Sequence, residues 1–149
     1  MASANLLLVR SIYDDWERGD FGSAEWAHPD IEFVIVGGPD PGTWTGVAGM
    51  ARGWFDFLNA WEDFHVLADG YQELDTERVL VPIHRSGHGR TSGLDVQEMG
   101  SRAADLFQLD AGKVVRLVHY WDRDHALADL GLAPEPHTAE SAADTADSA

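Results

Sequence analysis

Two side chains in the last third of the sequence, Asp105 and His119, have the types and spacing that acid/base chemistry needs. From Lys113 to Trp121 the side chains alternate as in a β-strand, and His119 falls in an otherwise apolar row. In the strand predicted at 96–109, Asp105 falls in the more apolar of the two rows. A carboxylate near an imidazole in an apolar setting is typical of a proton-transfer site.

The turn between these two strands decides how close the two groups come. A three-residue turn over 110–112 pairs Leu109 with Lys113 and places the apolar rows of both strands on one face. In that register Asp105 and His119 are diagonal neighbours, with Cβ atoms roughly 7 Å apart.

The pair of Asp105 and His119 has two possible interpretations. A charge on an apolar face is costly unless it is paired, so Asp105 and His119 could form a purely structural ion pair or hydrogen bond. Alternatively, they line a pocket and transfer protons. Pattern alone leaves both open.

Aromatic residues could line the same pocket. Most of the tryptophans lie at core spacing, and Trp16 and Trp54 are the two expected to touch a ligand. Trp121 follows His119 in the same row and is expected at the floor or rim. Tyr13 either turns its hydroxyl inward or, as is commoner, flanks the helix surface.

Metal and cofactor chemistry is not predicted. The chain has no cysteine, and although it has seven histidines, none forms a His-Glu-x-x-His run. His84 and His88 are four residues apart but enclose Arg-Ser-Gly, which breaks the helix that would place both on one face.

Composition restricts the partners. The 149 residues carry a formal charge of -16, from 10 basic and 26 acidic side chains. That charge repels phosphate backbones and anionic lipids, so neither nucleic acid nor a membrane surface is expected as a partner. No apolar run approaches the length of a membrane span, and we expect a cytoplasmic protein.

The predicted elements are gathered as helices early and strands late, which favours an α+β domain with helices covering one face of a curved sheet. The first helix begins after Ser3, which is a suitable N-cap, and ends at Gly19. The loop "GGPDPGTW" is expected to be a mobile lid. The other expected elements are a short helix within 20–28, a strand at 31–36, a helix that Thr45 caps, strands at 63–73, 77–86, 96–109 and 113–121, and a helix from Asp122 to Gly131.

The chain is expected to form one folded domain, residues 1–132, followed by a tail. Residues 133–149 contain only small, polar and acidic residues with proline, and lack the apolar surface that folding requires. We expect this acidic tail to be disordered.

Three segments carry a resemblance to a known superfamily. They are "YDDWERGDFGSAEWAHPDIEF", "TGVAGMARGWFDFLNAW" and, most specifically, "LDAGKVVRLVHYWDRDHALADLGL". Together they resemble the nuclear-transport-factor-two-like superfamily, and within it the SnoaL-like polyketide cyclases and ketosteroid-isomerase-like proteins. The resemblance implies a cone: a bent antiparallel or mixed sheet wrapped around three N-terminal helices, with a short C-terminal helix. It also implies an apolar pocket and a homodimer formed through the outer sheet face.

The catalytic residues of two enzymes of this superfamily are only partly present in this chain. Ketosteroid isomerase uses a general-base Asp, whose position falls at Ile35, and an oxyanion hole of Tyr and protonated Asp. The Tyr position falls at Ile12, one residue before Tyr13, whereas the Asp position matches Asp105. Steroid isomerisation by that mechanism is therefore not expected.

Limonene epoxide hydrolase is similar at "DTERV" and "HYWD". Its arginine position matches Arg78, but its two acid positions fall at Leu80 and His119. The resemblance therefore does not support epoxide hydrolysis.

The interpretation that best fits the sequence is a cofactor-free acid/base enzyme, of cyclase, isomerase or hydratase type, that acts on a hydrophobic small molecule. His119 and Asp105 are the predicted catalytic residues, with Arg78 and Tyr13 as helpers. The residues predicted to line the pocket are Ile12, Trp16, Ile35, Trp54, Leu80, Ala103, Phe107, Leu117 and Trp121. The alternatives are a non-catalytic ligand-binding or interaction module and a structural dimer whose pocket is filled by aromatic residues.

Overall fold

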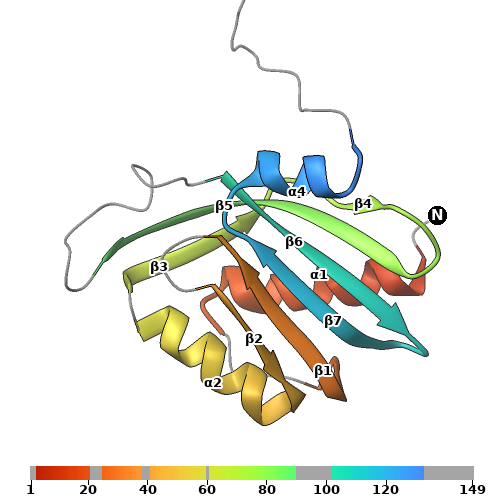
Figure 1. Ribbon diagram of the computed structural model, residues 1–149, viewed down its shortest axis with the longest axis horizontal. Helices are drawn as coiled ribbons and strands as arrows, with labels where there is room; N and C mark the ends of the chain where they lie inside the picture. Colours follow the sequence, from red (N-terminus) through yellow and green to blue (C-terminus); the bar gives the residue numbers. More distant parts are fainter. Residues whose placement is uncertain (1–2, 21–24, 38–40, 60, 90–101, 133–149) are drawn as a thin grey trace, which may run out of the picture.

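Seven strands form one mixed sheet, and helices lie against its two faces (Figure 1). The computed structural model describes residues 3–20, 25–37, 41–59, 61–89 and 102–132. The strands are β1 (Ala27–Val36), β2 (Gly42–Thr45), β3 (Trp61–Ala68), β4 (Gln72–Glu73), β5 (Arg78–Gly89), β6 (Arg102–Asp110) and β7 (Lys113–Tyr120). The helices in these ranges are α1 (Ala4–Glu17), α2 (Gly46–Asn59) and α4 (Arg123–Asp129). The predicted α+β class is confirmed.

The order of strands across the sheet is β2-β1-β7-β6-β5-β3, with β4 paired to β5. Strand β1 runs parallel to β7, and the other pairs are antiparallel. The parallel pair brings the first strand beside the last one, so β6 and β7 lie at the centre of the sheet. The sheet has two ends, at β2 and β3, and does not close into a barrel.

Helix α1 forms as predicted from its cap and its apolar spacing. The Ser3 side chain accepts a hydrogen bond of 3.1 Å from the backbone N–H of Leu6. Val9, Ile12 and Trp16 follow at helical spacing and are buried.

The helix predicted within 20–28 is wrong where the structure describes it. Residues 25 and 26 form a turn, and β1 already begins at Ala27. The backbone here bonds to β7 instead of to itself, because the carbonyl of Trp26 accepts from the N–H of Val114 at 2.9 Å. Residues 21–24 lie outside the described part.

The predicted lid contains a strand. Trp44 belongs to β2 and packs against Phe33 of β1, with ring centroids 5.6 Å apart. Its other side meets α2 at Gly53, where a Cβ atom would lie only 2.6 Å from the indole ring. Trp44 is therefore part of the packing between β1 and α2; residues 38–40 are outside the described ranges.

Other boundaries also differ from the prediction. Thr45 ends β2, and α2 begins at Gly46. The single strand predicted at 63–73 is divided into β3 and β4.

The β6–β7 hairpin has a shorter turn than predicted. Asp110 pairs with Lys113, and the two central residues, Ala111 and Gly112, have φ values of 52° and 80°. Positive φ at both positions is typical of a two-residue hairpin turn. The pairs on either side of a register shift are Leu109–Val114 and Gln108–Arg116. Val115 is thus an extra residue in β7, and this bulge brings the two apolar rows back onto one face.

Each face of the sheet has its own core. The inner face packs against α1 and α2 and includes Ile31, Val81 and Phe107. The outer face packs against α4 and includes Leu106 and Val118. No helix among the described residues is long and apolar enough to cross a membrane. The predicted tail, residues 133–149, is outside the part that the structure describes.

Candidate active site on the inner face of the sheet

Four polar side chains project from the inner face or from the helix that covers it. Asp105 comes from β6, His119 from β7, Arg85 from β5 and Tyr13 from α1. All are buried, with exposed fractions of 3%, 2%, 2% and 0%. We call these four residues the inner set.

Asp105 and His119 are closer than predicted. The bulge in β7 places them directly opposite one another instead of diagonally. Asp105 Oδ1 and His119 Nδ1 are 2.6 Å apart. The other carboxylate oxygen, Oδ2, accepts a hydrogen bond from the Tyr13 hydroxyl. The Tyr13 hydroxyl therefore points inward, and the commoner alternative, a side chain that flanks the helix surface, is wrong.

Arg85 completes the inner set from the far side of β6. Its Nη1 lies 3.2 Å from His119 Nε2, and its Nη2 donates to the Trp121 carbonyl at 3.0 Å. The guanidinium carbon is 4.2 Å from the centre of the Trp121 ring, which is a cation–π contact.

The hydrogen bonds determine which nitrogen of His119 carries the proton. A guanidinium has N–H donors and no acceptor, so Nε2 of His119 accepts from Arg85. Nδ1 then carries the proton and donates it to Asp105. The inner set is an ordered chain in which Tyr13 donates to Asp105, His119 donates to Asp105, and Arg85 donates to His119.

Burial shifts the pKa of two members of the inner set. It lowers the pKa of Arg85 to about 10, and the Asp105 carboxylate partly opposes this change. Burial, followed by the negative charge of Asp105, raises the pKa of Tyr13 well above its usual value. At neutral pH the guanidinium is therefore charged and the phenol is neutral.

Four half-buried aromatic residues form one cluster, of which Phe57 contacts the imidazole and Trp121 the guanidinium. We call them the aromatic rim: Trp54, Phe57, Phe64 and Trp121. Phe57 is central, with its ring centroid 5.5 Å from that of His119, 5.5 Å from Trp54 and 5.4 Å from Phe64. It also lies 6.3 Å from Trp121. Partly exposed aromatic rings therefore lie beside both groups, Phe57 beside the imidazole and Trp121 beside the guanidinium.

Solved structures share this architecture. An NTF2-like protein from Burkholderia thailandensis matches with a TM-score of 0.68 and 23% identity, over 90% of this chain and 100% of the other. A protein from Jannaschia designated a SnoaL-like polyketide cyclase matches with a TM-score of 0.64 and 14% identity, over 89% and 94%. A protein with a ketosteroid-isomerase-like fold from Catenulispora acidiphila, in complex with trimethylamine, gives 0.59 and 16%, over 85% and 93%.

The chain has the NTF2-like fold. The fold implied by the resemblance of the three sequence segments is thereby confirmed. No protein-family model and no curated protein matches the sequence. At these identities the NTF2-like fold does not determine the reaction, because one fold supports many functions.

Within the NTF2-like fold, most residues predicted to line a pocket lie on the inner face or against it. The buried ones are Ile12, Trp16, Ile35, Ala103, Phe107 and Leu117, and the half-buried ones are Trp54 and Trp121. Leu80 was predicted among them and lies on the opposite face, where it pairs with Leu106 and packs in the core under α4. The reason is the alternation of β5, which places Val79 and Val81 inward and Leu80 outward.

Arg78 is not near the inner set. It lies at the start of β5, with a side chain 40% exposed, and its Nε binds Asp75 Oδ2 at 2.9 Å. The predicted helper role has no geometric support, because the Asp75 pair holds this side chain at the surface.

Arg85 was missed by sequence reasoning, although the sequence contains a signal for it. The inward row of β5 is Val79, Val81, Ile83 and Arg85, so one charge ends an apolar row. The same observation identified Asp105 and His119 in β6 and β7.

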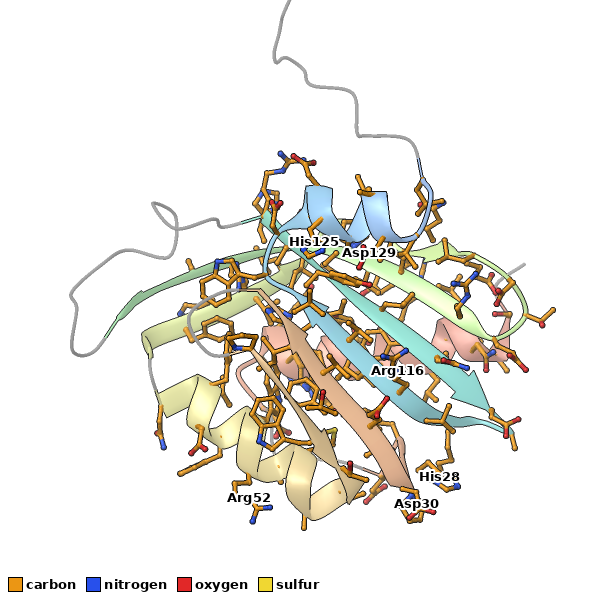
Figure 2. The ribbon with its side chains drawn as sticks, viewed as in Figure 1. His28, Asp30, Arg52, Arg116, His125 and Asp129 are labelled. Atoms are coloured by element: carbon orange, nitrogen blue, oxygen red, sulfur yellow. The ribbon has the colours of Figure 1, made fainter. Side chains whose placement is uncertain are left out.

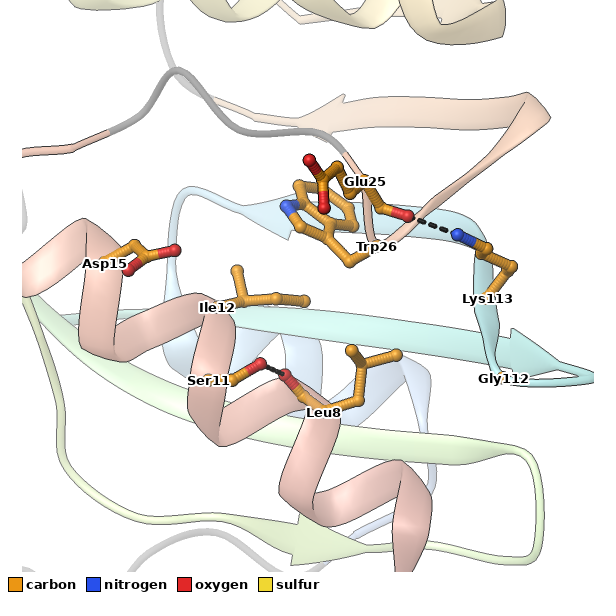
Figure 3. A pocket seen from close by; sticks show the side chains of 8 residues that line it. All are labelled: Leu8, Ser11, Ile12, Asp15, Glu25, Trp26, Gly112 and Lys113. Carbon is orange, nitrogen blue, oxygen red and sulfur yellow. Dashed lines mark hydrogen bonds between the residues drawn. The ribbon is translucent and has the colours of Figure 1, made fainter.

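A cavity of about 340 Å³ lies elsewhere, between α1 and the β6–β7 turn (Figure 3). Its lining residues are Leu8, Ser11, Ile12, Asp15, Glu25, Trp26, Gly112 and Lys113. Two of the polar side chains there bond to the main chain: Ser11 Oγ donates to the Leu8 carbonyl and Lys113 Nζ to that of Glu25. This cavity contains no member of the inner set, so a pocket beside Asp105 and His119 stays a prediction. The described residues contain no cluster of three His, Cys, Asp or Glu able to hold a metal ion.

Proposed function

We propose that this chain is a cofactor-free enzyme that transfers protons on a hydrophobic small molecule, by cyclase, isomerase or hydratase chemistry. The observation that carries the proposal is the hydrogen-bonded, buried chain of Tyr13, Asp105, His119 and Arg85 beside the aromatic rim. The similar fold of the Jannaschia protein designated a SnoaL-like polyketide cyclase supports this class of reaction.

The role of each residue follows from the direction of its hydrogen bond. His119 Nε2 has a lone pair and is the proton acceptor, since Nδ1 already carries a proton. Asp105 orients the ring and stabilises the imidazolium that forms when Nε2 takes a proton, as a buried aspartate does in serine hydrolases. Tyr13 keeps the carboxylate in place. The aromatic rim provides an apolar surface for the body of the substrate.

The proposal can be tested without knowing the substrate. A panel of hydrophobic ketones and 1,3-dicarbonyl compounds is incubated in D2O, and exchange of the proton next to the carbonyl is followed by NMR. We expect the protein to accelerate exchange for part of the panel. His119→Gln and Asp105→Asn should each reduce that rate by roughly 10²–10⁴-fold, the usual contribution of general acid/base catalysis.

The matched control is His125→Gln, which removes a half-exposed histidine on α4 and leaves the inner set intact (Figure 2). Full exchange by His119→Gln, with circular dichroism unchanged, would remove His119 from the mechanism. No acceleration by the native chain for any compound would leave the enzyme proposal without support.

A second candidate is a non-catalytic ligand-binding module. One observation favours it: in this structure His119 Nε2 and both carboxylate oxygens of Asp105 are occupied by hydrogen-bond partners. His119 can accept a proton at Nε2 only after this nitrogen loses its hydrogen bond from Arg85. A hydrophobic ligand retained in native mass spectra, with no exchange activity, would support binding over catalysis.

Dimerisation through the outer sheet face also stays a prediction. Helix α4 covers part of that face, where it packs on Leu106 and Val118. Light scattering on the purified protein would determine the number of chains in the assembly.

A further inference from the structure

Helix α2 packs against the sheet on one side only. Gly49, Met50 and Gly53 are buried on the side that meets β1 and β2. In Figure 1 the helix forms a margin of the molecule, and in Figure 2 the Arg52 side chain points away from the sheet. We call the exposed residues of α2 the α2 face: Ala48, Ala51, Arg52, Phe55, Asp56 and Asn59. Because they are spaced three and four apart, they lie on one side of the helix.

The α2 face is more apolar than a helix surface that contacts only water. Phe55 is 63% exposed, more than Leu7 and Leu67, the other exposed large apolar side chains among the described residues. Helix α2 has two charged residues in 14, whereas α1, which is equally long, has four. The solvent side of a helix is usually polar or charged. An exposed aromatic side chain beside two alanines indicates contact with another molecule.

The two charges of the α2 face make it complementary to itself. Arg52 and Asp56 are one turn apart on the same edge of the helix, and neither has a hydrogen bond or ion pair within the described part of the chain. In an antiparallel helix pair related by a two-fold axis, each residue faces the one equally far beyond the axis in the second copy. With the axis at the level of residue 54, Arg52 faces Asp56 of the second copy, and Asp56 faces its Arg52. The same axis places Phe55 between Ala51 and Phe55 of the second copy.

We propose that the α2 face is an interface between two copies of this chain, in which two antiparallel α2 helices pack around a two-fold axis. The small side chains of Ala48 and Ala51 allow the helix axes to approach to roughly 8–10 Å, the usual packing distance. Phe55 is the apolar anchor, and the pairs of Arg52 with Asp56 determine the orientation. The α2 face is distinct from the outer sheet face, part of which α4 covers.

The size of the α2 face indicates a weak association. A helix of 14 residues is about 21 Å long, so two of them bury less than the roughly 800 Å² per partner that is typical of a stable complex. Two chains of charge -16 also repel one another. We expect a dissociation constant of roughly 10–100 µM, measured by sedimentation equilibrium from about 5 µM to about 1 mM protein.

Replacing Phe55 tests the apolar part of the interface. Phe55→Ser should weaken association by at least about tenfold, because the anchor is lost. Leu67→Ser is the matched control: it removes another large apolar side chain, 56% exposed, from β3, and the dissociation constant should not change. If this control weakened association as much as Phe55→Ser does, the α2 face would not be the interface.

Charge reversal tests the two-fold arrangement. Arg52→Asp places acid against acid and Asp56→Arg places arginine against arginine, so each should weaken association by about threefold or more. The two variants change the net charge of the chain in opposite directions, and a general charge effect would therefore move their dissociation constants in opposite senses. The double variant Arg52→Asp/Asp56→Arg restores both pairs in reverse order, and its dissociation constant should return to within about twofold of the native value.

The inference would be overturned by a native chain whose mass shows no concentration-dependent increase up to about 1 mM. A native dissociation constant for Phe55→Ser, or a double variant no tighter than the single ones, would also overturn it. If chains associate through the outer sheet face as well, the α2 contact is a further step from two chains to four, and the variants should remove this step alone. Circular dichroism checks that each variant is folded, and the measurement on the native chain requires none of them.

Discussion

Two regions of the molecule combine an arginine, an aspartate and a histidine, and they differ in how these groups are connected. In the inner set His119 lies between Asp105 and Arg85. In the other region, which we call the α4 set, Arg123 donates to Asp69 Oδ2 at 2.5 Å and to the carbonyls of Ile83 and Ala103 at 2.7 and 3.2 Å. Asp69 in turn forms an ion pair with His84.

The position of the histidine separates the two sets. In the α4 set the aspartate is central, and the His84 side chain is 48% exposed at the end of the chain of contacts. In the inner set the histidine is central, and both its ring nitrogens are bonded and buried. Arg123 joins α4 to the main chain of β5 and β6, which is a structural role. The same three residue types therefore form a buried hydrogen-bonded chain in one arrangement and hold a helix against the sheet in the other.

Replacing Arg123 should have the largest effect on stability. Arg123→Met leaves two carbonyls of the sheet without this buried donor, and it removes the arginine from Asp69. We expect the free energy of unfolding to fall by about 2–4 kcal/mol in urea denaturation. The rate of proton exchange should not change, because the hydrogen bonds of Arg123 to the described residues go to Asp69, Ile83 and Ala103. A loss of exchange with stability unchanged would reverse the assignment of the two sets.

Replacing Tyr13 should have an intermediate effect. Tyr13→Phe keeps the edge-to-face contacts of the ring with Trp16 and Phe107 but removes the hydroxyl that donates to buried Asp105. We expect a loss of about 1–2 kcal/mol near pH 7, measured by urea denaturation. A change below about 0.3 kcal/mol would mean that Asp105 does not depend on this donor.

The same variant should alter the stability at alkaline pH. The pKa of Tyr13 is raised in the folded protein, so its contribution is complete below the unfolded value of about 10 and is lost as pH rises above it. Tyr71 and Tyr120, whose pKa values burial also raises, act in the native chain and in the variant alike. The stability of Tyr13→Phe should therefore decline less steeply above pH 10 than that of the native chain. Equal slopes would contradict a protonated Tyr13.

The smallest effect should come from His84. Its side chain is 48% exposed, so its ion pair with Asp69 is screened by solvent. We expect His84→Ala to change the free energy of unfolding by less than about 0.5 kcal/mol, again in urea. A loss as large as that of Arg123→Met would show that the α4 set depends on its histidine and resembles the inner set more closely than the distances indicate.

Sequence periodicity was most reliable within single strands. It placed Asp105 and His119 on one face and identified the apolar row around each, because side chains in a strand alternate regardless of what the strand packs against. It was less reliable for Trp26 and Trp44, where helix and loop were expected and the structure has a turn and a strand. There the deciding contacts, with β7 and α2, come from segments far along the chain.

The sequence by itself determined which side chains share a face of each strand, since alternation and helical spacing are local properties. Only the tertiary structure decided which of these side chains meet. Asp105 and His119 face each other because a short turn is followed by a bulge at Val115, and Arg85 reaches His119 because β5, β6 and β7 are neighbours in the sheet. Strand order and register depend on residues distant in sequence, which no local pattern encodes.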